Sequence, residues 1–511
     1  MHKSFQTLLV ILMVIGLAGC AKATPQPAII TEQPSMPTEQ AVVATTTPEL
    51  EEVTLRILLP GDRPAQMDEV IAEAESRMAK EGLNTKLDVV FVPWSDLGNI
   101  AVQLAAGDEI DLAFDAPWLA VNQNVAQGFY LELSDLLNEY GPNVLATRPD
   151  SIWEANQIGD GIYVVPLVGV TGGGKQYIVR KDIREALGFT PISSEDDLEK
   201  FLYAVKENYP DMIPLAPGPD GPVNHLLRHD FDTSVRSVIN GGDIRELYFR
   251  GNDGIVRNLF DDLDPLFWSQ TQRVNQWLID GLIPADMAPG NTYDIVNGNV
   301  AVFPTNDFGY SQVQLQAVEK LGGDLEWFTL FDQSKKQVNS FAVWNMIAIP
   351  YTSKHPDRAM MFLNWANEQS NYDLLAYGIE GKNYTPVGDE AYEPKPDNLY
   401  PWFPYAWIWN PVNDRQNNAS APGVIEWNLW SANPDSWEAD KLLGFKINDE
   451  PVLNEVAQLS ALHDQYMRPI LFGTVKDIDA WWAEYAKQAA PTARIVQAEY
   501  QKQIDAFLAN K

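Results

Sequence analysis

The stretch from Val53 to Asp115 reads VTLRILLPGDRPAQMDEVIAEAESRMAKEGLNTKLDVVFVPWSDLGNIAVQLAAGDEIDLAFD. Apolar residues gather in three short segments, 53–60, 87–92 and 110–114, which is typical of buried strands. Between the first two segments, apolar residues recur at helical spacing and stop near Gly82, and a second helical stretch precedes the third segment. This order predicts a parallel, doubly wound α/β sheet with right-handed crossovers.

Ligands of such sheets bind beside the carboxyl ends of the strands. In this chain the three predicted strand ends are followed by Asp62, by Trp94, and by the pair Asp115 and Trp118. We therefore expect these four residues to contact a ligand. For each carboxylate a surface or capping role explains its position equally well, and for each tryptophan the alternative is a place in the core.

The N-terminus carries an apolar run from Leu8 to Leu17, which is shorter than the roughly 20 residues that a membrane span needs. The run ends in Leu17-Ala18-Gly19-Cys20, and Cys20 is the only cysteine of the chain. This pattern resembles the bacterial lipoprotein signal, which implies that residues 1–19 are removed and that Cys20 is lipidated. The alternative is a free buried cysteine behind an ordinary secretory signal.

Residues 20–52 are rich in Pro and Thr and are predicted to form a flexible tether.

The net charge of the chain bears on the class of ligand. The formal net charge of −34 disfavours binding of nucleic acids, whereas binding of a neutral ligand does not depend on the sign of the charge.

No cofactor or metal is predicted. His225 and His229 have zinc-helix spacing but lack the glutamate and a third ligand. The phosphate-loop-like segment 169–175 is followed by Gln176 where that motif needs Ser or Thr. The glycines at 172–174 are better explained as a hinge between two strands.

Several segments resemble a known family. The chain contains LAAGDEID at 104–111, YIVRKDI at 177–183 and GNVAV at 298–302, in the order found in family 1 of the extracellular solute-binding proteins, the receptors of carbohydrate ABC importers. The segment YGIEGKNY at 377–384 and the tail from 473 to 503 are similar to the LipO-like lipoproteins of Gram-positive bacteria.

The resemblance implies a two-lobed periplasmic-binding-protein-like fold, in which each lobe is a doubly wound sheet and the ligand lies in the cleft between them. It assigns residues 53–170 and 293–345 to the first lobe. Residues 171–292 and 346–470 then form the second lobe, and residues 471–511 form C-terminal helices. The implied protein is a monomer.

The function implied by the resemblance is capture of a carbohydrate, an oligosaccharide, by closure of the lobes and delivery to ABC permease subunits. Such a protein is not an enzyme and is held on the outer face of the cell membrane by the lipid at Cys20. Two alternatives stay open: a secreted glycoside hydrolase, which needs a pair of carboxylates, and a surface carbohydrate adhesin without a transport role.

Sugars stack on aromatic rings and hydrogen-bond to polar side chains. The chain has 16 Trp, and an aromatic run interrupted by prolines extends from Tyr400 to Trp409. Beyond the four strand-end residues, the candidates for ligand contact are Asn306, Asp307, Trp344, Trp407, Trp409, Asp414 and Arg415.

The lipoprotein signal leads to a first prediction. The substitution Cys20→Ser removes the thiol that would carry the lipid, so the protein should appear in the medium rather than in the membrane fraction, as measured by immunoblotting of both. Ligand binding should be unchanged. Loss of binding in the released protein would instead make Cys20 a structural residue.

Overall fold

The computed structural model describes residues 50–169, 176–218, 221–227, 235–238, 246–285, 293–305, 312–330, 334, 336–420 and 422–511. Cys20, the glycines at 172–174, and the candidate ligands Asn306 and Asp307 lie outside these ranges. Within them, no helix is long and apolar enough to cross a membrane.

The first sheet confirms the order predicted for Val53 to Asp115. Strands β1 (Val53–Pro60), β2 (Thr85–Val92) and β3 (Leu112–Asp115) run parallel, with α1 (Met67–Lys80) and α2 (Ile100–Ala106) between them in the chain. Helix α1 forms because its apolar residues share one face, and the buried residues of that face are Met67, Val70, Ile71, Ala74 and Met78.

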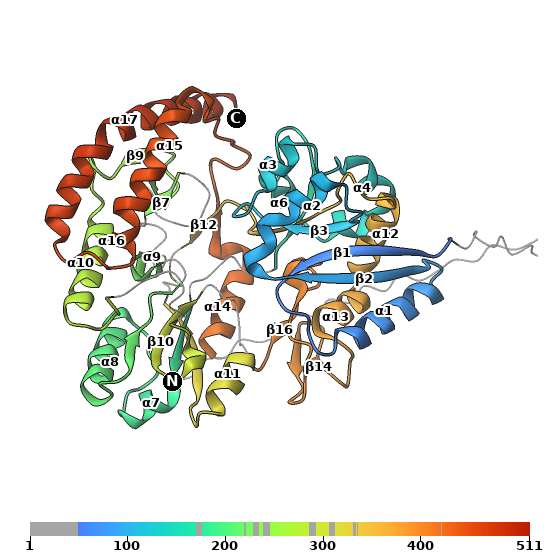
Figure 1. The fold of residues 1–511 in the computed structure, drawn as a ribbon, viewed down its shortest axis with the longest axis horizontal. Coiled ribbons are helices and arrows are strands. Elements are labelled where there is room, and N and C mark those ends of the chain that lie inside the picture. Colours follow the sequence, from blue (N-terminus) through green and yellow to red (C-terminus); the bar gives the residue numbers. More distant parts are fainter. Residues whose placement is uncertain are drawn as a thin grey trace, which may run out of the picture. The chain divides into compact units, whose positions relative to one another are not determined.

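Two further strands complete this sheet, whose order is β2-β1-β3-β13-β4. Strand β4 (Val164–Leu167) is one of the two edge strands, and β13 (Asn345–Ala348) lies antiparallel between β3 and β4. The helices whose buried residues join this core are α3 (Val121–Ala126), α4 (Ser134–Tyr140), α5 (Pro142–Ala146), α6 (Asp150–Ala155), α12 (Pro356–Ala366) and α13 (Gln369–Tyr377). Figure 1 shows α13 packed beside α1.

The second sheet has the order β11-β5-β10-β6. Its strands are β5 (Gln176–Arg180), β6 (Ile213–Leu215), β10 (Val300–Thr305) and β11 (Leu325–Thr329). Strands β10 and β11 both pair antiparallel with β5. Its helices are α7 (Lys181–Ala186), α8 (Glu195–Asn208), α9 (Pro222–Leu227), α10 (Pro265–Ile279), α11 (Gln312–Glu319) and α14 (Pro422–Ala432).

The strand pairing corrects the expected grouping of segments. Residues 293–345 were expected beside 53–170, but their strands β10 and β11 belong to the second sheet. Conversely, residues 346–409, expected in the second lobe, supply β13 and most of the later residues of the first core. The reason is that Val302 pairs with Val179 of β5, whereas Ile347 pairs with Phe114 of β3, so the chain returns to the first sheet only after β11.

The C-terminal segment packs on the second core. Helices α15 (Leu453–Leu462) and α17 (Ile478–Asn510) lie side by side in Figure 1, and the short α16 (Arg468–Leu471) lies between them in the chain. The described residues form three further small sheets. One contains β7 (Val235–Ser237), β8 (Leu247–Arg250) and β9 (Arg257–Asn258), and another contains β12 (Gln337–Asn339) and β17 (Trp437–Ala439). The third contains β14 (Tyr384–Val387), β15 (Ala391–Pro394) and β16 (Gln416–Asn417).

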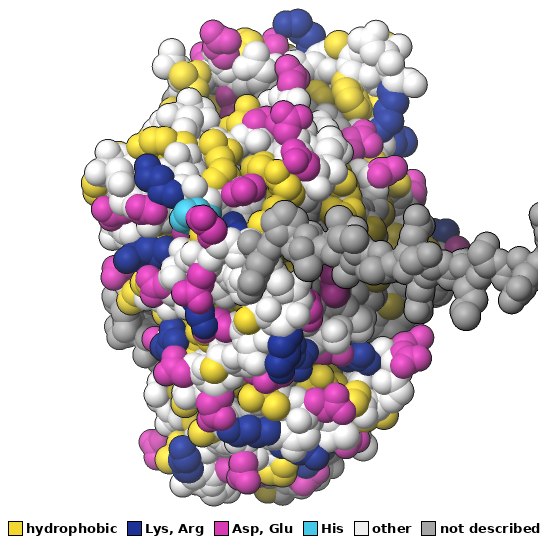
Figure 2. Space-filling model, turned by 90° about the vertical axis from the view of Figure 1, so that its right-hand side faces the viewer, with side chains coloured by type: hydrophobic (Ala, Val, Ile, Leu, Met, Phe, Trp, Pro, Cys, Tyr) yellow, Lys and Arg dark blue, Asp and Glu magenta, His cyan; other side chains and the backbone are white. Residues whose placement is uncertain are grey.

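The surface carries both signs of charge. Figure 2 shows one face of the molecule, on which Asp and Glu side chains are interspersed with Lys and Arg rather than gathered into a block of one sign. On this face the excess of acidic residues is therefore spread out, which fits a role in solubility.

The central position of β3 leads to a second prediction. Phe114 is fully buried in the first core, so Phe114→Ala should lower the free energy of unfolding by about 3–5 kcal/mol, because the substitution removes apolar contacts and leaves a cavity. Urea unfolding monitored by circular dichroism measures the change. The matched control is Val102→Ala on α2, whose side chain is 67% exposed and whose loss should change stability by less than about 0.5 kcal/mol.

Candidate functional site

Five aromatic side chains form a continuous row beside the carboxyl ends of β2 and β3, and we call them the aromatic shelf: Trp94, Trp118, Trp402, Tyr405 and Trp409. Their neighbouring ring centroids are 5.3–6.4 Å apart: Trp94 is 6.3 Å from Trp118 and 6.4 Å from Tyr405, and Trp402 is 5.7 Å from Tyr405 and 5.3 Å from Trp409. Trp94 and Trp118 are 52% and 45% exposed, so this end of the shelf presents ring surface to solvent. Because the two exposed rings are neighbours, they form an apolar surface patch, which makes the shelf a candidate binding surface.

The end of β1 places Trp94. The ring belongs to a short 3₁₀ helix (Trp94–Asn99) that follows β2, and it lies against Gly61, the residue after β1. Gly61 has φ +91°, and a Cβ atom there would lie 3.1 Å from Trp94 Nε1. Glycine is therefore needed both for the backbone conformation and for the close approach of the ring.

The start of β13 places Trp118. Its indole Nε1 donates a hydrogen bond of 2.8 Å to the carbonyl oxygen of Trp344, which directly precedes β13. Trp344 itself is 41% exposed. The structure thus brings together Trp118 and Trp344, which the sequence analysis named as separate candidates. The contact between them is made by the backbone carbonyl group of Trp344.

Trp409 is held at its backbone and at its ring. Its carbonyl oxygen accepts hydrogen bonds from Arg148 Nη2 at 3.0 Å and from the backbone N–H of Val168 at 3.2 Å. Its indole Nε1 donates to Asp414 Oδ2 at 2.7 Å. The edge of the ring lies so close to Gly169 that a Cβ atom there would overlap it.

Asp414 is a buried acceptor rather than an exposed ligand. Besides Trp409, the carboxylate accepts a hydrogen bond from Tyr377 OH at 3.0 Å. Burial raises the pKa of Asp414 to about 6, although these hydrogen bonds oppose the shift. Because the unfolded chain has the lower pKa of 3.8, protonation favours the folded state, and this contribution to stability is lost as the pH rises from about 4 to about 6.

Asp115 is also engaged inside the first core. Its carboxylate accepts from Tyr130 OH at 2.6 Å, from Asn124 Nδ2 at 2.8 Å and from the backbone N–H of Ala116 at 2.7 Å. Burial raises the pKa of Asp115 above its usual value. With only 3% of its surface exposed, Asp115 fixes the turn that leads to Trp118, so the expectation that it contacts a ligand is replaced by the capping alternative.

Of three other candidates, one supports a loop, one lies in the first core and one is exposed. Arg415 forms a bidentate ion pair with Asp373, at 2.9 Å for both bonds, and donates to the carbonyl oxygen of Asp389 at 2.7 Å, so it supports the loop. Trp407 is fully buried in the first core. Asp62 is exposed next to Gly61, at the Trp94 end of the shelf, and stays a candidate for ligand contact.

The sequence candidates did not include Trp402 and Tyr405, which connect Trp94 to Trp409. Both lie in the aromatic run from Tyr400 to Trp409, but nothing in the run distinguishes them from Trp407. The distinguishing signal is the 3₁₀ turn Pro404–Ala406, because it turns Trp407 inward and leaves Tyr405 beside Trp94.

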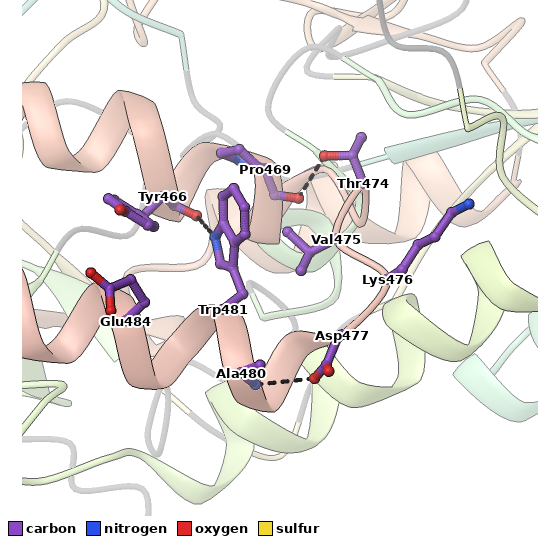
Figure 3. A pocket seen from close by; sticks show the side chains of 9 residues that line it. All are labelled: Tyr466, Pro469, Thr474, Val475, Lys476, Asp477, Ala480, Trp481 and Glu484. Atoms are coloured by element: carbon purple, nitrogen blue, oxygen red, sulfur yellow. Dashed lines mark hydrogen bonds between the residues drawn. The ribbon is translucent and has the colours of Figure 1, made fainter.

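A hollow of about 630 Å³ lies elsewhere, between α16 and the start of α17 (Figure 3). Its residues are Tyr466, Pro469, Thr474, Val475, Lys476, Asp477, Ala480, Trp481 and Glu484. Several of its polar groups are used within the chain: Trp481 Nε1 donates to the carbonyl oxygen of Tyr466 at 2.9 Å, and Asp477 caps α17 through the backbone N–H of Ala480 at 3.1 Å. The aromatic shelf, with its exposed rings, is therefore the stronger candidate site.

The side chains of the shelf are chemically suited to binding a ligand. Aromatic faces attract apolar CH surfaces of a ligand, and the two nearby buried carboxylates, Asp115 and Asp414, are already committed to hydrogen bonds within the core. In the parts of the chain that the structure describes, no group of three or more His, Cys, Asp or Glu residues is arranged to hold a metal ion.

Comparison with protein families gives two matches. The family described as "Bacterial extracellular solute-binding protein" matches residues 61–372, which is more than half of the chain. A domain of unknown function, DUF3502, matches residues 441–509 and so covers α15 to α17.

Individual relatives are distant in sequence but similar over nearly the whole chain. A carbohydrate ABC transporter substrate-binding protein of Streptococcus pneumoniae serotype 4 (strain ATCC BAA-334 / TIGR4) is 24% identical in an alignment of 466 residues, which covers 88% of this chain and 90% of the relative. The crystal structure of the N-glycan transport solute binding protein NgtS from Streptococcus pneumoniae has a TM-score of 0.70 at 20% identity, covering 89% of this chain and 99% of NgtS. Its complex with Man5GlcNAc has a TM-score of 0.64 at 21% identity, covering 90% and 99%. The expected two-lobed α/β fold class is confirmed.

The contact of Gly61 with Trp94 leads to a third prediction. Gly61→Ala should lower the free energy of unfolding by about 1–2 kcal/mol, because φ is positive, and should displace the Trp94 ring. Fluorine NMR of 5-fluorotryptophan-labelled protein measures the displacement, with the Trp94 resonance assigned by Trp94→Phe.

Gly82→Ala is the matched control, because Gly82 has φ +81° and a Cβ atom there meets nothing within 4 Å. This variant should show a similar loss of stability with an unchanged Trp94 resonance. An unchanged Trp94 resonance in Gly61→Ala would contradict the role of Gly61 in placing the ring.

Proposed function

This chain belongs to the family of bacterial extracellular solute-binding proteins, and we propose from this premise that it captures an oligosaccharide on the aromatic shelf and delivers it to an ABC permease. Membership of this family implies that the protein acts outside the cytoplasm. The observation that carries the proposal is the row of five rings with two of its tryptophans about half exposed. A ligand that extends over several rings in a row is better matched by a chain of sugars than by a single sugar.

The names of the relatives support a glycan as the ligand class. One relative is named as a carbohydrate ABC transporter substrate-binding protein, and NgtS has been crystallised with Man5GlcNAc. We take Man5GlcNAc as a probe for this chain and not as its established ligand.

We propose that the two sheets are the cores of two ligand-binding lobes. The first lobe would comprise residues 50–169 and 343–420, and the second residues 176–330 and 422–511, following the strand pairing and the separate cores. Closure of these lobes on the ligand is a population shift driven by contacts that exist only in the closed form. Lipidation of Cys20 would then keep the receptor beside its permease and raise its effective concentration there.

A glycoside hydrolase is not favoured by the site. Hydrolysis needs two carboxylates about 5–10 Å apart that reach the glycosidic bond, one of them with a raised pKa. Asp115 and Asp414 do have raised pKa values, but both are buried and hydrogen-bonded to tyrosine, asparagine or tryptophan side chains. The site thus supports binding without turnover.

A fourth prediction tests the proposed function. The protein from Ala21 onward is screened with a glycan panel that includes Man5GlcNAc, by thermal unfolding and then by isothermal titration calorimetry, and each mixture is analysed for cleavage products by chromatography. We expect a rise in melting temperature with at least one glycan, because a ligand that binds only the folded state stabilises it. No product should form.

Shelf variants connect binding to the site. Trp94→Ala and Trp118→Ala should each weaken the glycan at least about tenfold, which corresponds to about 1.4 kcal/mol. Tyr203→Ala is the control, because Tyr203 is a 40% exposed aromatic residue on α8, outside the shelf. Cleavage of a glycan would contradict the binding function, and equal losses in all three variants would contradict the assignment of the shelf.

A further inference from the structure

We infer that the amide of Gln176 and the hydroxyl of Thr329 are the groups by which the second sheet recognises hydroxyl groups of the glycan. The two residues lie at one end of that sheet, outside the aromatic shelf, and neither was predicted from the sequence as a ligand contact. The inference rests on the proposed function for the identity of the ligand, whereas the observations that carry it belong to the protein alone.

Gln176 is a fully buried residue whose side-chain amide lacks a partner. Its exposed fraction is 0%, and among the residues that the structure describes neither Oε1 nor Nε2 has a hydrogen-bond partner. Thr329 is half-buried as a residue, but its Oγ1 is enclosed and likewise has no partner within the described chain. Buried polar atoms are nearly always hydrogen-bonded, so three such atoms in neighbouring residues need an explanation.

Strand pairing places the two side chains together. Thr329, the last residue of β11, lies directly opposite Gln176, the first residue of β5, in antiparallel register. Residues opposite one another in an antiparallel pair direct their side chains to the same face of the sheet, with Cβ atoms about 4.5–5.5 Å apart. One sugar can therefore contact both the amide and the hydroxyl.

Alternation along the strands identifies the face on which the two groups lie. Ile178 and Trp327, two residues along each strand, belong to a small core that also contains Val424 of α14. Side chains two residues apart share a face, so Gln176 and Thr329 lie on the face that α14 covers. Because β11 is an edge strand, the half-buried Thr329 stands at the edge of the sheet and Gln176 lies one strand further in.

This end of the sheet is the one at which a ligand is expected. Strands β10 and β11 both end there, at Thr305 and Thr329, on either side of Gln176. Ligands of α/β sheets bind beside the carboxyl ends of the strands. Gly169, against which the ring of Trp409 packs, is seven residues before Gln176 in the chain, so their Cα atoms are at most about 25 Å apart. Both groups are thus within reach of an oligosaccharide that lies on the shelf.

The chemistry of the two groups suits a neutral ligand with several hydroxyl groups. An amide side chain offers a donor and an acceptor side by side, and a threonine hydroxyl can donate or accept. A sugar hydroxyl can also do both, so two adjacent hydroxyls can bond to Oε1 and Nε2 of Gln176 at once. A charged ligand would need an opposite charge, and the charged side chain of the same strand, Arg180, is paired with Asp182 at the other end of β5.

The stability of the fold alone does not account for these side chains. A buried polar atom that loses its hydrogen bonds to water without gaining others in the protein destabilises the folded state. Methionine has nearly the shape of glutamine, and valine has that of threonine, and neither would carry this penalty. Hydroxyl groups of a glycan would supply the missing hydrogen bonds, so the penalty is offset only in the complex.

A fifth prediction uses Gln176→Met and Thr329→Val in the protein from Ala21 onward. Without glycan, both variants should unfold thermally at the temperature of the wild type or above it, as followed by circular dichroism, because each removes unpartnered polar atoms at nearly constant volume. Calorimetry with Man5GlcNAc, or with the glycan of the panel that binds the wild type most tightly, should show weaker binding. We expect a loss of at least about tenfold for Gln176→Met and at least about threefold for Thr329→Val.

Thr271→Val is the matched control. Thr271 is 1% exposed, and its Oγ1 also has no hydrogen-bond partner among the described residues. It lies on α10, between Phe267 and Val274 of the second core, rather than at the end of a strand. This variant should likewise keep or raise the melting temperature, but it should bind the glycan as tightly as the wild type.

The outcomes separate the inference from the proposed function. The inference alone is overturned if the glycan binds Gln176→Met as tightly as the wild type while Trp94→Ala loses it. It is also overturned if Gln176→Met lowers the melting temperature together with the affinity, or if Thr271→Val weakens binding as much as Thr329→Val. If no glycan of the panel binds the wild type, the proposed function fails and the inference fails with it.

Discussion

Antiparallel insertion of β13 between β3 and β4 is the constraint on which the site depends. Met346 pairs with Asp115 and Ile347 pairs with Phe114, so the start of β13 lies beside the carboxyl end of β3. That register brings the Trp344 carbonyl oxygen to the indole of Trp118. It also returns the chain to the first core, where the segment that follows carries Trp402, Tyr405 and Trp409. Without this pairing, the shelf would lack the rings that join its exposed and buried ends.

The first five elements of the fold could be predicted from the sequence because their signals are local. The apolar runs of β1, β2 and β3 and the buried face of α1 are visible as periodicity, and parallel neighbours joined by a helix leave few topologies. The partners of β10 and β13 could not be predicted, because both are short apolar strands of the same kind. Val302 and Ile347 differ in which distant residues they meet, Val179 in one case and Phe114 in the other, and no local pattern records this choice.

The candidate site could be predicted in part for the same reason. Trp94 and Trp118 follow predicted strand ends, and the rule for parallel sheets was sufficient to place them beside a common edge. Asp115 and Asp414 were expected to contact the ligand because Asp115 ends the third predicted strand and Asp414 follows the aromatic run. Their burial depends on donors that fold back onto them, Tyr130 for Asp115 and Tyr377 for Asp414. Both carboxylates are consequently taken up by hydrogen bonds within the core.

The close approach of Gly169 to Trp409 has a consequence for how such sequences vary. Because a Cβ atom at position 169 would overlap the indole, the two positions share one small volume at the end of the first sheet. A homologue with a larger residue at 169 has room only for a smaller one at 409, and a homologue that keeps the tryptophan must keep the glycine. Residue sizes at these two positions, 240 apart in the chain, should therefore vary in opposition across related sequences.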